Sequence, residues 1–170
     1  DRPDFTESTD AVPFGHAQLE MGYTFTYDHE SGIRTRDHTV PEFLLRLGIV
    51  RNVELRIGWD GYTYANTRGK TTMFSGGTYS TTTDHRWSQG SNDMTFGTKV
   101  KLLEQDEWIP HFGVITEISV PSGSRDFSSG DVDPGAVLAW AYDISDKFSV
   151  AGNVGIASAT SDSRRFVQTS

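Results

Sequence analysis

Alternation of apolar and polar residues along most of the chain is the feature that most constrains its fold. In VPEFLLRLGIVRNVELRIGWDG, residues 40–61, large apolar residues alternate with charged ones on either side of a short turn. A period of two residues places successive side chains on opposite faces of a β-strand, and the 3.6-residue period of an amphipathic helix is hard to find anywhere. The stretch therefore predicts an antiparallel hairpin with one apolar and one charged face.

The same pattern predicts about seven strands and the beginning of an eighth. Most are about as long as the 9–11 residues with which a strand crosses a bilayer, against 5–6 in soluble sheets. They cover residues 17–27, 38–49, 53–62, 94–103, 108–120, 136–142 and 148–158, and RRFVQTS at 164–170 begins the next. Long polar connections (28–37, 65–93, 121–135) alternate with short ones (50–52, 104–107, 143–146), as in outer-membrane barrels.

Aromatic residues gather near both ends of the predicted strands. Those beside the short connections are Trp108, Trp140, Tyr142 and Phe148, and those near the long ones are Tyr27, Trp59, Tyr62 and Tyr64. Two such bands are typical of barrels that cross both interfaces of a membrane. We weigh this interpretation above the general preference of aromatic residues for strands.

The turn of the first hairpin decides which residues face each other. A three-residue turn at 50–52, with Asn52 in the left-handed conformation, places Arg46 opposite Arg56, whereas a two-residue turn would mix the faces. Because two opposed arginines repel, we expect Glu54, diagonal to Arg46, to bridge both of them. Lys99 and Lys101 are expected to meet Glu20, Glu117 or Asp60 on other strands.

Two environments suit a sheet with one apolar and one charged face. A soluble sheet buries the apolar face, while a membrane barrel turns it toward lipid and keeps the charges inside. The apolar face carries runs of Leu, Ile, Phe and Trp, so we expect the second arrangement. The residues expected to face the lumen, along a solute path, are Glu20, Glu42, Arg46, Glu54, Arg56, Asp60, Lys99, Lys101, His111, Glu117 and Asn153. Those expected to face lipid are Leu45, Leu47, Leu55, Ile57, Phe112, Val114, Val150 and Val154.

Composition sets further limits. The 170 residues suffice for one domain, which we divide into an extended N-terminal segment (1–15) and a β-barrel domain (16–170). A net charge of −8 argues against nucleic acid as a partner, and the absence of cysteine excludes disulfides and thiolate zinc sites. No apolar run approaches the roughly 20 residues of a membrane helix, and DRPDFTESTD lacks the features of a signal peptide.

The sequence contains no convincing motif for catalysis, a cofactor or a metal. Neither a Walker loop nor a Rossmann glycine pattern is present, and no two histidines have ligand spacing on a helix. His111, Glu117 and Ser119 share one face of a predicted strand, but at about 3.3 Å per residue the first two lie roughly 20 Å apart and form no triad. DVD at 131–133 is interpreted as a turn rather than a calcium site. We expect neither enzymatic activity nor a cofactor.

Several stretches together resemble one known family. They are RPDFTES, HAQLEMGYTF, VPEFLLRLGIVRNVELRIGWDGY, NDMTFGTKVKLLEQDEWIPHFGVITEISVPSG and AGNVGIAS, which extend in order from Arg2 to about Ser158. This set resembles the transporter-like family linked to the meta-pathway of phenol degradation. The resemblance implies an outer-membrane β-barrel that takes up or passes small hydrophobic compounds, with aromatic compounds the usual suggestion, and it supplies no catalytic residues.

The C-terminal part departs from this resemblance. Family members usually continue past the GNVG strand with several more strands, whereas this sequence ends at RRFVQTS. We therefore expect a fragment of a larger antiparallel up-and-down transmembrane β-barrel, with about seven to eight strands present. If the chain is complete, it would close as an eight-stranded barrel filled by side chains.

The leading hypothesis is a barrel of the bacterial outer membrane that passes small molecules through a polar lumen. Its partners would be outer-membrane lipid and a small-molecule solute, and the sequence does not indicate an oligomeric state. Three alternatives stay open: a plugged barrel with a structural role, a soluble β-barrel or sandwich that binds a ligand inside, and a membrane-embedded lipid hydrolase.

Overall fold

The computed structural model describes residues 7–30, 32–75, 78–145, 147–161 and 164–169. These residues form one antiparallel sheet, which confirms the predicted all-β class. The strands are β1 (Ala17–Glu30), β2 (Ile33–Val50), β3 (Val53–Trp59), β4 (Tyr62–Ser75), β5 (Thr78–Ser91), β6 (Met94–Leu103), β7 (His111–Val120), β8 (Asp133–Ser145), β9 (Phe148–Ser161) and β10 (Arg164–Thr169). Within the described ranges, no helix is long and apolar enough to cross a membrane.

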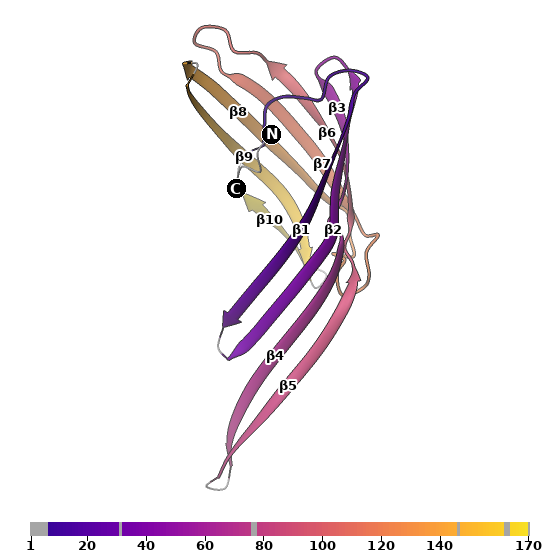
Figure 1. The fold of residues 1–170 in the computed structure, drawn as a ribbon, viewed down its shortest axis with the longest axis vertical. Coiled ribbons are helices and arrows are strands. Elements are labelled where there is room, and N and C mark those ends of the chain that lie inside the picture. The colour runs from indigo at the N-terminus through magenta and orange to yellow at the C-terminus, as the bar shows by residue number, and fades with distance from the viewer. Residues whose placement is uncertain (1–6, 31, 76–77, 146, 162–163, 170) are drawn as a thin grey trace.

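The ten strands make eight passes of an up-and-down meander, because β3 continues into β4 and β5 into β6. β2 pairs with β1 along one edge and with β3 and then β4 along the other. Among the described residues the sheet is open, since β1 pairs with β2, β10 pairs with β9, and these two outer strands do not pair with each other. Figure 1 shows the β4–β5 hairpin extending well beyond the ends of β6 to β9.

The long pass formed by β3 and β4 breaks at Asp60 and Gly61, where the chain leaves one ladder and enters another. Gly61 has a φ of 81°, a conformation that glycine adopts without strain. A side chain there would also meet the Pro41 carbonyl oxygen at 2.6 Å. Glycine is therefore the residue that allows the pass to bend at this point.

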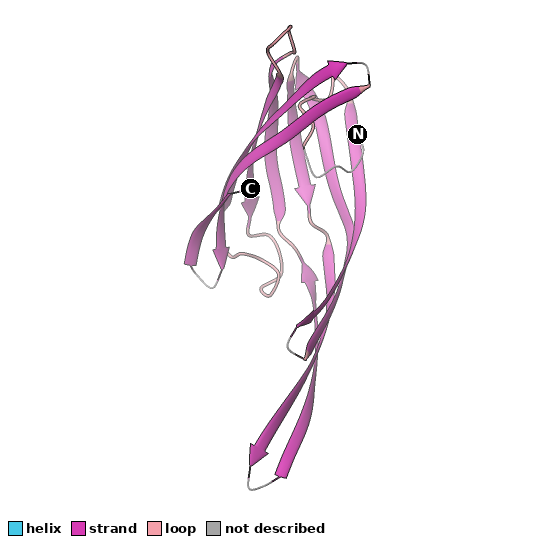
Figure 2. Cartoon of the chain, turned by 90° about the vertical axis from the view of Figure 1, so that its left-hand side faces the viewer, coloured by secondary structure: helices cyan, strands magenta, loops and turns pink. Residues whose placement is uncertain are grey.

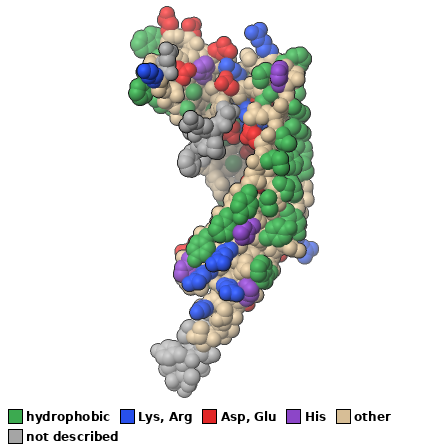
Figure 3. All heavy atoms as spheres, viewed as in Figure 1, with side chains coloured by type: hydrophobic (Ala, Val, Ile, Leu, Met, Phe, Trp, Pro, Cys, Tyr) green, Lys and Arg blue, Asp and Glu red, His purple; other side chains and the backbone are tan. Residues whose placement is uncertain are grey.

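The two faces of the curved sheet have opposite chemistry. In β3 burial alternates strictly, so that Glu54 and Arg56 are buried while the apolar residues between them stay half-exposed. Leu19 and Val154 are 60% and 63% exposed, whereas Glu54 and Lys99 are fully buried. Figure 2 shows the curvature, and Figure 3 shows apolar side chains in a band along the convex side with charged side chains in the hollow. The inside of the curve is thus polar and the outside apolar.

A β-bulge in β2 exchanges the two faces halfway along this strand. Gly22 of β1 pairs with Glu42 and Thr24 pairs with Thr39, so two residues of β2, one of them Pro41, stand opposite a single residue of β1. Proline lacks the N–H that a ladder requires, and a bulge is one of the few places in a sheet that accepts it. The side chains on the convex face of β2 are consequently odd-numbered after the bulge and even-numbered before it.

Residues 65–93, which the sequence predicts to be a long loop, belong mainly to β4 and β5 instead. The prediction depended on apolar alternation, which this segment lacks because both of its faces carry polar residues. Threonine is frequent in it, and the branched threonine side chain favours extended backbone without any apolar face. The predicted loop at 28–37 is wrong for the same reason, since residues 28–30 extend β1 and residues 33–37 extend β2.

The turn between β2 and β3 is one residue shorter than predicted, and Val53 pairs with Val50 instead of Ile49, yet the predicted register holds farther along the two strands. Val50 pairs with Val53, which leaves two turn residues, and Asn52 has the expected left-handed conformation with a φ of 65°. A register shift between Gly48 and Val50 absorbs the missing residue. The predicted opposition of Arg46 and Arg56 is therefore confirmed.

Candidate functional site

The strand register gathers charged residues from β2, β3 and β6 on the concave face. Arg46 pairs with Arg56, Arg56 with Gly97, and Gly97 with Glu117. Glu54 lies two residues nearer to the short turn and pairs with Lys99. Because side chains two residues apart project from the same face of a strand, these groups share one space.

Arg46 and Glu54 form a bidentate ion pair at the centre of this face. The Nε–Oε1 distance is 2.8 Å and the Nη2–Oε2 distance is 2.9 Å. Arg46 also reaches Glu20 at 3.1 Å, and Arg56 reaches Glu54 at 3.5 Å. The predicted bridge by Glu54 is confirmed. It compensates the facing arginines in a place where an unpaired charge would be costly.

The N-terminal segment, residues 7–16, lies across the concave face and completes the ionic cluster (Figure 1). The Val12 N–H donates a hydrogen bond to Glu54 Oε2 at 2.7 Å. The carbonyl oxygen of Asp10 accepts from Arg46 Nη2 at 3.2 Å and from Lys99 Nζ at 3.4 Å. Thr9 and Val12 are both buried. Backbone groups of the segment thus satisfy charged groups of the sheet.

The partners of Lys99 and Lys101 differ from the prediction. Lys99 Nζ lies 3.7 Å from a carboxylate oxygen of Glu7, and Lys101 Nζ lies 3.1 Å from both Asp10 and Glu104. Strand register could not reveal this, because the segment that supplies two of the carboxylates lies outside the sheet. In the described part of the chain, neither lysine forms an ion pair with Glu20, Glu117 or Asp60.

Small residues and an amide make room for the segment. A side chain at Gly48 would collide with backbone carbonyl groups of the segment, and one at Gly113 would lie 3.2 Å from the Thr9 carbonyl oxygen. With its carbonyl oxygen turned toward the segment, the Asn153 amide accepts a hydrogen bond from the Glu7 N–H at 2.6 Å. The concave face is therefore shaped to hold this particular stretch.

Carboxylates dominate the concave face farther from the short turns. A hollow of about 490 Å³ there is bordered by the carboxylates Asp37, Glu42, Asp60 and Asp93. Asp93 accepts hydrogen bonds from Gly123 N at 2.8 Å and Ser129 N at 2.9 Å, which ties the β7–β8 loop to the sheet. The concave face thus carries an ionic cluster near the short turns and an acidic hollow near the β7–β8 loop.

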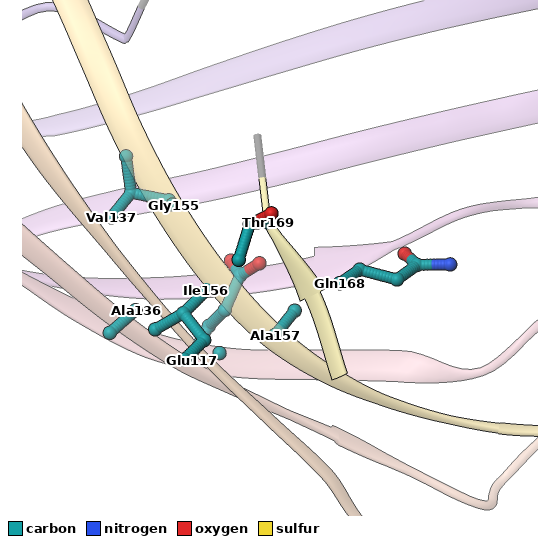
Figure 4. A pocket seen from close by; sticks show the side chains of 9 residues that line it. Glu117, Ala136, Val137, Gly155, Ile156, Ala157, Gln168 and Thr169 are labelled. Atoms are coloured by element: carbon teal, nitrogen blue, oxygen red, sulfur yellow. The ribbon is translucent and has the colours of Figure 1, made fainter. Parts of the chain in front are cut away.

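Glu117 and His111 lie toward opposite ends of β7 and have different surroundings. Glu117 points into a pocket of about 460 Å³ that is lined by residues of β7, β8, β9 and β10, where Figure 4 also shows Thr169. His111 Nδ1 accepts a hydrogen bond from Gln105 N at 3.1 Å, and its Nε2 lies 3.8 Å from Asp143. The two residues therefore do not act as a pair, in agreement with the strand geometry.

The 131–133 stretch stands at the start of β8. Asp133 accepts hydrogen bonds from the backbone N–H and the hydroxyl of Thr160 at 3.2 Å and 2.8 Å. Among the residues that the structure describes, no group of three or more His, Asp or Glu side chains could hold a metal ion. Asp133 accordingly ties β8 to β9.

The sequence interpretation missed Glu7, Asp10 and Asp93 as members of this site. A signal for the first two is present, since the first ten residues, DRPDFTESTD, contain four acidic residues and one basic residue. Their charge is opposite to that of the four basic residues expected on the inner face. The role of the predicted lumen residues in a solute path stays a prediction.

A known family matches almost the whole chain. Its model, described as "Putative MetA-pathway of phenol degradation", aligns with residues 1–169. No curated protein and no solved structure gives a significant match.

Proposed function

The chain belongs to this phenol-degradation family, and from that premise we propose that it is a β-barrel protein of the bacterial outer membrane that passes small molecules through a polar lumen. One observation carries the proposal. The sheet buries Arg46, Glu54 and Lys99 on its concave face, while large apolar side chains are exposed on its convex face. A soluble sheet has the reverse arrangement, because water drives apolar surface inward.

The convex face supports contact with hydrocarbon. Its exposed apolar residues come from several neighbouring strands and include Leu19, Met21, Phe96, Ile118, Leu138, Val150 and Val154. A band of exposed apolar side chains across neighbouring strands marks a membrane or protein contact. The lipid-facing role expected for this face is part of the proposal.

The family description favours small aromatic compounds as the solute. Lys99 and Arg56 are buried beneath the N-terminal segment. Once the segment moves aside, their ammonium and guanidinium groups could contact an aromatic ring through cation–π attraction and donate hydrogen bonds to a phenolic oxygen. The proposal assigns positioning and selection to these residues and assigns no chemical step.

A plugged barrel with a structural role is the second candidate, and the N-terminal segment favours it. The segment holds Glu54, Arg46 and Lys99 through its backbone and so occupies the space that a solute would use. Passage would require the segment to shift, and the ion pairs of Glu7 and Asp10 would control that shift.

Vesicle swelling separates the two candidates. The full chain would be reconstituted in vesicles, and entry of benzenesulfonate, an aromatic anion that crosses bilayers poorly, would be followed by light scattering. We expect measurable entry with the native chain and faster entry with Glu7→Ala combined with Asp10→Ala, which removes the side-chain ion pairs of the segment and leaves only its backbone contacts. The control is Glu104→Ala, because Glu104 is a partner of Lys101 outside the segment.

Swelling that rises in the double variant and stays unchanged in the control would support a gated path. Failure of both the native chain and the double variant to admit the solute, although both are inserted, would favour the plugged barrel. Recovery of the native chain as a monodisperse species without detergent would reject the membrane proposal itself.

A further inference from the structure

The outer ends of β1, β2, β4 and β5 carry an ordered surface on their convex side, beyond the β2 bulge. Strand register places its residues in three successive rows across the four strands. The rows are Phe25–His38–Tyr64–Gln89, then Tyr27–Arg36–Asn66–Trp87, and then His29–Arg34–Arg68–His85. Figure 3 shows Lys, Arg and His side chains gathered in this region, next to apolar ones.

The outermost row consists only of arginine and histidine side chains. Arg34 and Arg68 are directly paired and both are exposed, so their positive charges repel each other across the strands. The carboxylates of these strand segments fall on the opposite face, because the period of two residues places them in the intervening rows: they are Asp28, Glu30, Asp37 and Asp84. Among the described residues, no carboxylate forms an ion pair with Arg34, Arg36 or Arg68.

The middle row joins this basic row to the aromatic one. The Arg36 guanidinium lies over the Tyr27 ring, 5.8 Å from its centroid. The exposed Trp87 ring meets His85 edge-on at 5.5 Å, and His85 Nε2 lies 3.0 Å from Asn66 Oδ1. Rings with a polar partner at one end are characteristic of the headgroup level of membranes. The rows therefore run from a mainly aromatic row, through one that mixes aromatic and polar side chains, to a cationic row.

The cationic end is hollowed. Arg34, Arg36, Asn66 and Arg68 line a shallow pocket of about 160 Å³ on this surface. Three guanidinium groups and an amide around one small space offer several N–H donors, an arrangement that matches the oxygens of a phosphate group. Because no carboxylate among the described residues lines this pocket, an anion bound there would relieve the repulsion between Arg34 and Arg68.

We propose that this pocket binds the phosphate headgroup of an anionic lipid in the membrane leaflet next to the β4–β5 hairpin. The inference rests on the proposed membrane location and goes beyond it, since it names a lipid class and the residues that select it. The rows with Phe25 and Tyr27 set the depth of the protein in the leaflet. Arg34, Arg36 and Arg68 bind the phosphate on the headgroup side of these rows.

Native mass spectrometry of the full chain in detergent tests the proposal. The chain would be titrated with phosphatidic acid, whose phosphate is bare, and with phosphatidylcholine of the same acyl chains, whose phosphate is masked. We expect Arg34→Gln combined with Arg68→Gln to weaken phosphatidic acid binding about tenfold or more, as the loss of charge-assisted bonds implies. Phosphatidylcholine binding should not change.

Arg86→Gln is the matched control. Arg86 lies in the same hairpin next to His85, but its pairing with Thr67 places it on the concave face. Native-like affinity in this control with loss in the double variant supports the site. Equal loss in both, or no loss in either, overturns it. Complete displacement of the lipid by inorganic phosphate would show a site for the free ion and would also overturn it.

The solute-entry assay distinguishes failure of the lipid-site proposal from failure of the proposed function. Because Arg34 and Arg68 lie on the outside of the sheet, their double variant should admit solute at the native rate. Loss of lipid selection with intact entry would leave the proposed function untouched, while absence of entry with intact lipid selection would affect the proposed function alone.

Discussion

The part of the sheet around β3 and β6 and the hairpin of β4 and β5 belong to the same two passes of the chain, yet they follow opposite rules. In the first, buried charges alternate with half-exposed apolar residues, as Glu54 and Ile57 illustrate. In the second, both faces are polar for long stretches, and residues 81–87 are all exposed. Backbone pairing is equally regular in the two regions.

The difference teaches what residue alternation reports. A strand needs two chemically different faces only where its surroundings differ on the two sides. Around β3 one face meets the ionic cluster and the other meets, by our proposal, hydrocarbon. Beyond the cationic row, as at residues 81–84 of β5, both faces are exposed, and extended structure there needs only hydrogen bonding and residues that tolerate it, such as threonine. Alternation is therefore a sign of environment rather than of β-structure.

The sharpest test of the comparison removes the central carboxylate. Glu54→Ala leaves Arg46 and Arg56 buried without their shared partner, and we expect a loss of about 3–5 kcal/mol in the free energy of unfolding. Asp84→Ala in the exposed β5 should change stability by less than about 0.5 kcal/mol. Urea unfolding of the full chain in detergent, followed by tryptophan fluorescence, measures both. Similar losses in the two variants would remove the distinction between the regions.

The second test places a charge on the convex face. If this face lies in hydrocarbon, Ile57→Arg should cost about 2–4 kcal/mol, because Ile57 stands well inside β3 between apolar neighbours. Thr82→Arg, at an exposed position of β5, should stay within about 0.5 kcal/mol. Unfolding from lipid vesicles is the measurement. A cost for Ile57→Arg as small as that for Thr82→Arg would contradict the lipid-facing assignment.

The smallest effect is expected at the edge of the ionic cluster. Lys101 pairs with Asp10 and Glu104, and both carboxylates are largely exposed. Lys101→Gln should therefore cost at most about 1 kcal/mol, and the difference should shrink at high salt because water and ions screen such pairs. Unfolding at low and high ionic strength checks this. A loss comparable to that of Glu54→Ala would mean that burial does not determine how much each ion pair of the cluster contributes to stability.

Much of the central region could be predicted because its rules are local. The opposition of Arg46 and Arg56 was predicted from parity across one turn, although a register shift beside a shorter turn is what produces it, and the bridging role of Glu54 was predicted from the repulsion between them. The bounds of β6 also agree with the predicted residues 94–103. Such predictions need only the period of a strand and the sign of neighbouring charges.

Other features depend on contacts that sequence spacing does not encode. Glu7 and Asp10 meet Lys99 and Lys101 about 90 positions away, as the Asp10–Lys101 separation of 91 shows. The β4–β5 hairpin lacks the apolar alternation on which the strand prediction relied. The bulge at Pro41 then reverses which residues of β2 face outward, so that the basic row with Arg34 could be placed only from the observed pairing.

By itself, the sequence determined that the chain forms long antiparallel strands with one apolar and one charged face, because a period of two residues permits no other regular structure. Only the tertiary structure decided which face lies inside the curve and what fills it. The N-terminal backbone fills that space because it can satisfy Glu54, Arg46 and Lys99 at once, and such a match depends on distances between segments rather than on their order.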